Sequence, residues 1–117
     1  MHMRRKPEGT ELRGRASLDR MDRLLEHRGR LGISVLLSQA DALSFSRLKD
    51  LLQETDGNLG AQLRKLEENG YLTVRKEFVD RKPVSWYALT PLGRRALRGH
   101  LAALSELLAH VPYEGDP

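Results

Sequence analysis

TDGNLGAQLRKLEENGY, residues 55–71, has the period of an amphipathic helix, but its first turns are unusually small. Three leucines share one helical face with Gly70 at spacings of three and four: Leu59, Leu63 and Leu66. Gly57 and Gly60 stand in the opening turns, where glycine costs roughly 1 kcal/mol relative to alanine. We therefore expect the leucines to pack on the domain and the opposite, thinned face to serve another purpose.

The face opposite the leucines gathers small and polar residues, followed by two cations and a carboxylate: Gly57, Asn58, Ala61, Arg64, Lys65 and Glu68. A helix with this profile can lie deep in the DNA major groove, which is ~12 Å wide, because small residues let the backbone approach while Asn, Gln and Arg side chains reach base edges. Its free N–H groups and positive dipole end also suit a phosphate. On this feature alone, a surface helix with a loose N-terminus is an equal alternative.

The segment before this helix completes a helix-turn-helix pattern. Ser44 or Ser46 can cap a short helix whose leucines form an apolar stripe over residues 48–52. The residues ETDG, 54–57, then supply a turn into the glycine-containing helix. In such a unit the first helix supports the second against a DNA duplex.

The segment after this helix changes from a period of 3.6 to a period of 2. LTVRKEF, residues 72–78, alternates apolar and polar residues, VDRKP supplies turn chemistry, and VSWYAL, residues 84–89, is rich in β-branched and aromatic residues. The pattern predicts a β-hairpin with a charged tip. Its cations can bind phosphates or enter a minor groove: Arg75, Lys76, Arg81 and Lys82. Taken singly, a charged hairpin tip is better explained by solubility and protection against edge pairing.

Two helices and a connector are expected before this unit. Ser17 can cap a helix that reaches Arg28. Residues 31–39 form a second helix that is apolar nearly all round, which is typical of a buried central helix. The connector ADALSF, residues 40–45, has room for a very short edge strand.

The last helix has a seam of leucines. Thr90 is expected to cap it, and Pro91 occupies its first position, which tolerates a residue without an N–H. Pro112 ends it. Leucines repeat along it at alternating spacings of four and three: Leu97, Leu101, Leu104 and Leu108. This seam is more apolar surface than one small domain can cover, so we expect a second copy to share it.

The composition is that of a soluble globular protein with one domain: 117 residues, 39% hydrophobic and 31% charged. The absence of cysteine excludes disulfides, thiol nucleophiles and cysteine-based metal sites. The longest apolar run, residues 33–37, is too short to span a bilayer, and no apolar region follows the basic start MHMRRK, so we expect no membrane association and a cytoplasmic location. The net charge of +4 favours anionic partners, nucleic acid first.

The sequence holds no pattern of a catalytic site. No serine has a His and Asp arrangement around it, and no glycine-rich phosphate loop is present. The acidic residues are scattered along helices opposite Arg and Lys, where surface ion pairs are the ordinary explanation. We therefore expect neither an enzyme nor a cofactor.

The order of these elements predicts an α+β fold that is mostly α, with three parts along the chain. Residues 1–15 have almost no apolar content and are expected to form a flexible basic arm. Residues 16–111 form the domain, which includes the C-terminal helix over residues 91–111. Residues 112–117 form a tail.

The run LRKLEENGYLTVRKEFVDRKPVSWYALTPLGRRAL, residues 63–97, resembles the winged helix-turn-helix transcriptional regulators of the MarR and ArsR type. It carries L-x-x-L-E-x-x-G-Y-L in the second helix, D-R-K near the hairpin tip, and L-T-P-L-G-R at the start of the last helix. The resemblance implies that the second helix enters the major groove, that the hairpin forms a wing on the minor groove or backbone, and that the terminal helices form a twofold dimer.

The resemblance also implies which residues bind DNA. The recognition-helix candidates are Thr55, Gly57, Asn58, Ala61, Gln62, Arg64 and Lys65. The candidates on the wing and its flanks are Ser46, Arg75, Lys76, Arg81 and Lys82. Asp80 holds the acidic place of a D-R-R-like motif, in which Lys82 replaces the second Arg and loses its bidentate geometry.

The chain departs from these families in two respects. Its terminal helices are shorter than those of MarR-type proteins, whose ligand cavity lies beside them, so the sequence does not support an effector pocket and the effector stays unknown. ArsR-type metal sensors use Cys pairs or His and carboxylate sets, and only His100, Glu106 and His110 are comparable here. We expect these histidines to be solvated surface residues and predict no metal site.

The sequence thus predicts a sequence-specific regulator that binds double-stranded DNA at an inverted-repeat operator as a homodimer. The predicted dimer contacts are Leu18, Met21, Leu25, Leu97, Leu101, Leu104 and Leu108. Two other functions fit the same fold, since fold does not determine function. One is a protein-interaction module that binds an acidic surface, and the other is a nucleic-acid-binding protein without sequence preference.

Overall fold

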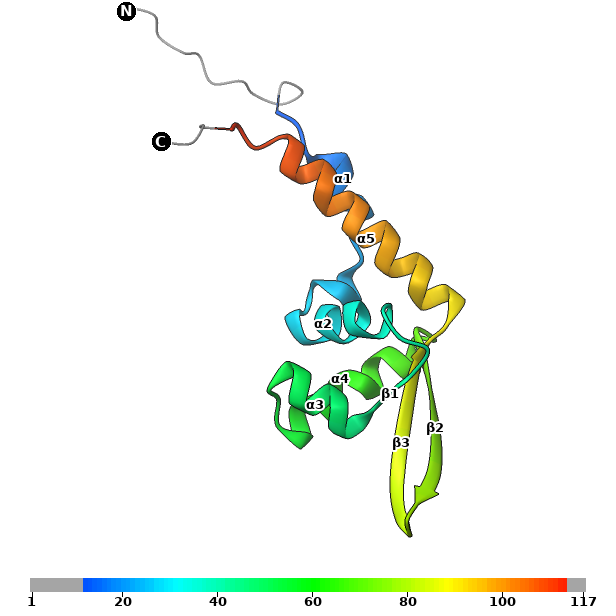
Figure 1. The fold of residues 1–117 in the computed structure, drawn as a ribbon. Coiled ribbons are helices and arrows are strands. Elements are labelled where there is room, and N and C mark those ends of the chain that lie inside the picture. Colours follow the sequence, from blue (N-terminus) through cyan, green and yellow to red (C-terminus); the bar gives the residue numbers. More distant parts are fainter. Residues whose placement is uncertain (1–11, 114–117) are drawn as a thin grey trace, which may run out of the picture.

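The computed structural model describes residues 12–113, which form a mostly helical α+β fold (Figure 1). In chain order, the elements are α1 (Arg15–Arg20), the 3₁₀ helix η2 (Arg23–Glu26), α2 (Arg28–Leu37), β1 (Leu43–Ser44), α3 (Phe45–Leu52), α4 (Asp56–Glu68), β2 (Leu72–Val79), β3 (Lys82–Leu89) and α5 (Pro91–Ala109). The expected fold class is confirmed, with α3 and α4 as the helix-turn-helix pair and the β2–β3 hairpin, from here on the wing, following them.

The three strands form one antiparallel sheet in the order β1-β3-β2. The two-residue β1 pairs with β3 through Leu43 and Tyr87, which confirms the expected edge strand. Asp80 and Arg81 form the tip of the wing with φ values of 51° and 68°. Positive φ at both central residues is the type I′ geometry, whose twist matches that of the flanking strands, so the hairpin turns within two residues.

The core consists almost entirely of leucine side chains, which come from η2, α2, α3, α4, the wing and α5. Its members are Leu25, Ile33, Leu37, Leu48, Leu59, Leu63, Leu66, Leu72, Leu89 and Leu97. The three leucines of α4 are all buried, as the helical period predicts. Because they attach α4 to α2 and the sheet, the other side of α4 is left facing away from the domain.

Two of the three predicted N-cap positions are confirmed. The Ser44 hydroxyl accepts a hydrogen bond from the Arg47 N–H at 3.1 Å, and the Thr90 hydroxyl accepts one from the Gly93 N–H at 3.0 Å. Each satisfies a backbone donor that the first turn leaves free. The prediction for Ser17 is wrong, because this residue lies inside α1, which begins after Gly14.

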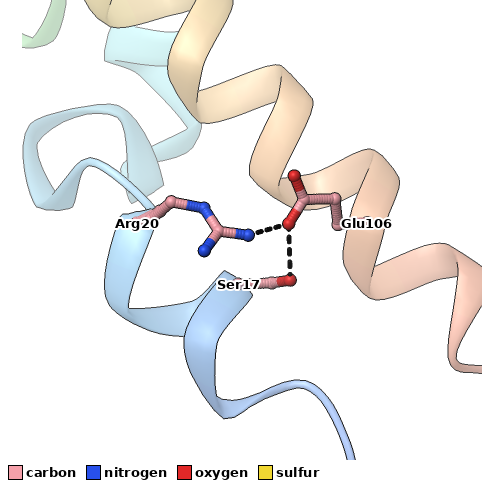
Figure 2. A network of polar contacts seen from close by, with 3 residues as sticks. All are labelled: Ser17, Arg20 and Glu106. Atoms are coloured by element: carbon pink, nitrogen blue, oxygen red, sulfur yellow. Dashed lines mark hydrogen bonds and ion pairs between the residues drawn. The ribbon is translucent and has the colours of Figure 1, made fainter.

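Ser17 instead connects α1 to α5. Its side chain is buried and donates a hydrogen bond to Oε1 of Glu106 at 3.0 Å. Arg20 donates to the same oxygen, so two residues one turn apart on α1 share one carboxylate on α5 (Figure 2). α1 therefore lies against the C-terminal part of α5, at the opposite end of the molecule from the wing (Figure 1).

The predicted continuous helix from Ser17 to Arg28 is interrupted. Met21 is extended, with ψ of 145°, and the chain resumes as η2. Asp22 causes the new start, because its carboxylate accepts a hydrogen bond from the Leu24 N–H at 2.8 Å. The break places Leu25 in the core.

Two of the predicted segments lie largely outside the described residues. These are the basic arm, of which residues 1–11 are not described, and the tail, of which residues 114–117 are not described. Among residues 12–113, no helix combines the length and apolar character needed to cross a bilayer.

Candidate nucleic-acid interface

The small face of α4 is open. Six exposed or half-exposed positions make up this surface, which we call the open face of α4: Gly57, Asn58, Gly60, Ala61, Arg64 and Lys65. A Cβ atom added at Gly57 or Gly60 would meet no atom within 4 Å. Packing inside the described chain therefore does not require either glycine, and their absent side chains leave backbone accessible to another molecule.

The cations of the open face are available to a partner. Arg64 and Lys65 are exposed, and within residues 12–113 neither side chain forms an ion pair. The start of α4 carries the carboxylate of Asp56, which would repel a phosphate. Lys49 lies 2.8 Å from that carboxylate, whose hydrogen bond and charge raise the pKa of Lys49. Lys49 therefore neutralises the Asp56 carboxylate at the N-terminal end of α4, where an anion would bind.

Three predicted recognition residues already have partners within the protein. The Thr55 hydroxyl caps α4 by accepting from the Asn58 N–H at 3.2 Å. The Asn58 side chain donates to Glu54 at 3.4 Å, a long bond that a base edge could replace. Gln62 is half-buried and accepts a hydrogen bond from Arg30 of α2 at 2.7 Å. The Gln62 side chain is thus turned towards α2, and its role in DNA binding stays a prediction.

A groove of about 400 Å³ separates α4 from the sheet. Arg64 and Glu67 line one side, and Lys76 and Tyr87 line the other. Burial, followed by the nearby Glu67 carboxylate, raises the pKa of Tyr87, so its hydroxyl remains a hydrogen-bond donor at neutral pH. The groove thus presents two cations, one carboxylate and a phenol from different elements towards the same space.

The predicted wing residues divide between the two faces of the sheet. Lys76 faces the groove beside α4, whereas Arg75, one residue earlier, lies on the other face and pairs with Glu77. Glu77 also accepts from the Trp86 indole N–H at 2.9 Å, so Arg75 belongs to a cluster directed away from α4. Arg81 and Lys82 are exposed at the tip.

Two exposed residues at the start of α3, Ser46 and Arg47, join the cations of α4 and the wing as candidate DNA contacts. Ser46 is exposed in the first turn of α3, as is Arg47, which the sequence interpretation did not select. Arg47 follows the capping Ser44, and its charge beside a helix start was the signal that could have identified it.

The predicted dimer residues also fall into separate groups. Leu18, Leu101 and Leu108 are exposed, at 53%, 42% and 71%. Met21 and Leu104 are half-buried. Leu25 and Leu97 are core residues of the single chain, so their assignment to a dimer interface is wrong: η2 and the start of α5 turn them inward.

His100 differs from the expected solvated histidine. It is buried, and its Nδ1 accepts a hydrogen bond from the Asp22 backbone N–H at 2.9 Å. The Asp22 carboxylate accepts a hydrogen bond from the Tyr71 hydroxyl. Burial, and next this bond, raises the pKa of Tyr71 to about 12. Of the two histidines considered as metal ligands, only His110 is exposed to solvent. Residues 12–113 contain no group of three His, Cys, Asp or Glu side chains that could hold a metal ion.

A second groove, of about 620 Å³, lies between α2, α3 and α4. Seven of its thirteen lining residues are Leu, Ile or Val, and it reaches α4 only at Leu59 and Gln62. It is therefore separate from the open face of α4.

Comparison with known proteins agrees with this geometry. Residues 30–108 match the family described as winged helix DNA-binding domain. The chain is 30% identical over 82 residues to the uncharacterized protein MJ0432 of Methanocaldococcus jannaschii, which covers 70% of this chain and 89% of the relative. The structure is similar to that of a transcriptional regulator homologue from Pyrococcus horikoshii OT3, with 27% identity and a TM-score of 0.77 over 84% of this chain and 99% of the other.

The fold also matches a solved DNA complex. Sco3205, a MarR family transcriptional regulator from Streptomyces coelicolor whose structure contains DNA, has 24% identity and a TM-score of 0.57, over 85% of this chain and 69% of the other.

Proposed function

The chain belongs to the winged helix DNA-binding domain family, and from this premise we propose that it is a sequence-specific transcriptional regulator that binds an inverted-repeat operator as a homodimer. Two solved structures that it resembles are a transcriptional regulator homologue and a MarR family transcriptional regulator. In this proposal α4 reads the major groove, the wing contacts the flanking minor groove or backbone, and α1 with α5 joins two copies.

The observation that carries the proposal is the open face of α4. Two glycines with unoccupied space above them stand where a helix approaching base edges needs the smallest side chains. Arg64, one to two turns further along, can reach a guanine or a phosphate with its planar fork of donors. A helix that only covered the domain would gain stability from alanine at both glycines.

The groove beside α4 suits the DNA backbone. Lys76 and Arg64 approach it from the sheet and from α4, so a phosphate strand between them would contact both charges. Ser46 and Arg47 at the start of α3 would contact a neighbouring phosphate. The protein thus offers base-reading and backbone-binding groups on adjoining elements.

The homodimer rests on the exposed leucines of the terminal helices. Leu18, Leu101 and Leu108 leave apolar surface on α1 and α5 that a second copy would cover. A twofold dimer would place two copies of α4 in successive major grooves, ~34 Å apart or a multiple of that distance, so the operator should be an inverted repeat. The structure of Sco3205 in complex with DNA supports DNA as the partner.

Selection of bound duplexes from a random pool tests the proposal. We expect one inverted-repeat sequence to be enriched. If each copy neutralises about four phosphates, log K against log[salt] for that duplex falls with a slope of roughly −7. Binding with the same slope but no enriched sequence would indicate a nucleic-acid binder without preference, and no binding at low salt would leave the protein-interaction module.

A further inference from the structure

The tip of the wing carries apolar side chains that the rest of the described chain does not cover. Phe78 is 77% exposed, and Pro83 lies directly opposite it in the register of β2 and β3. Both are one or two residues from the Asp80–Arg81 turn. The hairpin therefore gains little burial from Phe78, and a polar β-former would serve the strand equally well.

Phe78 lies on the same face of the sheet as the groove beside α4. Side chains alternate along β2, so Leu72, Val74, Lys76 and Phe78 share one face. Leu72 is in the core, and Val74 and Lys76 line the groove. Phe78 continues this line beyond the groove to the far end of the wing, which projects past the helices (Figure 1).

Three cations and the exposed carboxylate of Asp80 lie around this apolar tip. Arg81 and Lys82 are exposed at the turn, and Lys76 precedes Phe78 on the same face. A partner that matches both features must be a polyanion with apolar surface between its charges. The DNA minor groove meets this description, because phosphates line its edges and base and sugar surfaces form its interior.

We propose that Phe78, backed by Pro83, is an apolar wedge that enters the minor groove beside the site of α4 and kinks the duplex at a flexible pyrimidine–purine step. This inference rests on the proposed function, since it requires α4 to hold the wing against DNA. Arg81 at the turn and Lys76 on the same face as Phe78 bind the phosphates on either side of the wedge. The protein then selects sequence at the flank of its operator by the ease of deforming that step, without a hydrogen bond to a base.

The test compares two neighbouring residues that point to opposite faces of the wing. Phe78→Thr removes the wedge and keeps a residue that favours strands, and Val79→Thr places the same residue on the face away from α4. The probe is a 30-base-pair duplex recovered from the random pool by the unaltered protein, with dyes at both ends to report bending and 2-aminopurine at the flanking step to report unstacking. Circular dichroism and Trp86 fluorescence check that each variant folds.

The unaltered protein and the Val79→Thr variant should bend the duplex and raise 2-aminopurine emission. The Phe78→Thr variant should bind roughly tenfold more weakly, the scale of one lost aromatic contact with a base, with little bending or unstacking. Equal bending and affinity in all three proteins would overturn the wedge and leave the proposed function intact. Failure of the unaltered protein to bind any duplex would remove both proposals. A change in oligomer size by light scattering, with unchanged DNA binding, would overturn the wedge and assign Phe78 to a protein contact.

Discussion

His100 of α5 and Asp22, 78 residues earlier in the chain, are joined by a hydrogen bond of 2.9 Å from the Asp22 backbone N–H to the imidazole Nδ1. The Asp22 carboxylate caps η2 through Leu24 and also accepts from the Tyr71 hydroxyl at the start of the sheet. One aspartate thus connects α5, η2 and the segment that follows α4. These bonds fix the proposed dimer helices relative to the DNA-binding helices.

Replacing His100 with leucine should destabilise the fold. The substitution leaves the Asp22 N–H without an acceptor in a buried place, which costs about 1–3 kcal/mol. His110→Leu on the same helix is the matched control, because that residue is exposed. Urea unfolding of the three proteins measures the difference. Equal loss in both variants would contradict the role assigned to the Asp22 bond.

The Tyr71 hydroxyl predicts a pH dependence of stability. Its pKa is raised from about 10 to about 12 in the folded state, so between these values the unfolded chain loses the proton first. The folded state binds more protons in this window, and stability falls as pH rises through it. In the Tyr71→Phe variant, stability should fall less steeply with pH than in the unaltered protein. Tyr87, whose pKa is also raised, is present in both proteins and contributes the same pH dependence to each. Urea unfolding at several pH values measures it, and parallel profiles would contradict the assignment.

Two glycines of α5 should respond oppositely to alanine. A Cβ at Gly93 would lie 2.1 Å from the Tyr71 carbonyl oxygen, which belongs to the backbone and cannot give way easily. Gly93→Ala should therefore destabilise the protein by about 1–3 kcal/mol or more. A Cβ at Gly99 would meet nothing within 4 Å, and Gly99→Ala should stabilise the helix by about 0.5–1 kcal/mol. Thermal unfolding decides the signs, and a neutral Gly93→Ala would show that the contact is absent.

The exposed leucines of α5 predict a change of oligomeric state. Leu101→Glu with Leu108→Glu places two carboxylates on the proposed interface, and light scattering should change from dimer to monomer at micromolar concentration. Leu51→Glu is the control, since Leu51 is also exposed but lies on α3. Operator affinity should fall with the dimer, because one copy reads one half-site. A dimer that survives both substitutions would place the interface elsewhere.

Local rules account for most of the fold. The period of the leucines predicted the buried face of α4, and capping chemistry predicted the roles of Ser44 and Thr90. These features depend on residues within one or two turns. The break after α1 depends on a local contact, the Asp22 cap on Leu24, which the helical period does not show. The buried state of His100 depends on its bond to Asp22, 78 residues away, and no helical period could reveal that partnership.

In the candidate site, too, some features follow from the local sequence and others from contacts with distant residues. The openness of Gly57 and Gly60 follows from their place opposite the leucines. Gln62 lies near the edge of that face, and only the contact with Arg30 of α2 decides its direction. The strand pattern of residues 72–78 does not distinguish Phe78 from a buried apolar residue, since its exposure depends on how far the wing projects beyond the helices.

The open face of α4 is tested most directly by measuring the DNA dissociation constant of the Gly57→Ala, Gly60→Ala double variant beside its unfolding free energy. Both Cβ atoms fit without contact, so the variant should be more stable by roughly 1–2 kcal/mol. If α4 enters the major groove on this face, the added methyl groups hold the backbone away from the bases and weaken operator binding by about tenfold, the scale of one lost base contact. A more stable variant with unchanged or tighter DNA binding would contradict the proposal that this face reads DNA.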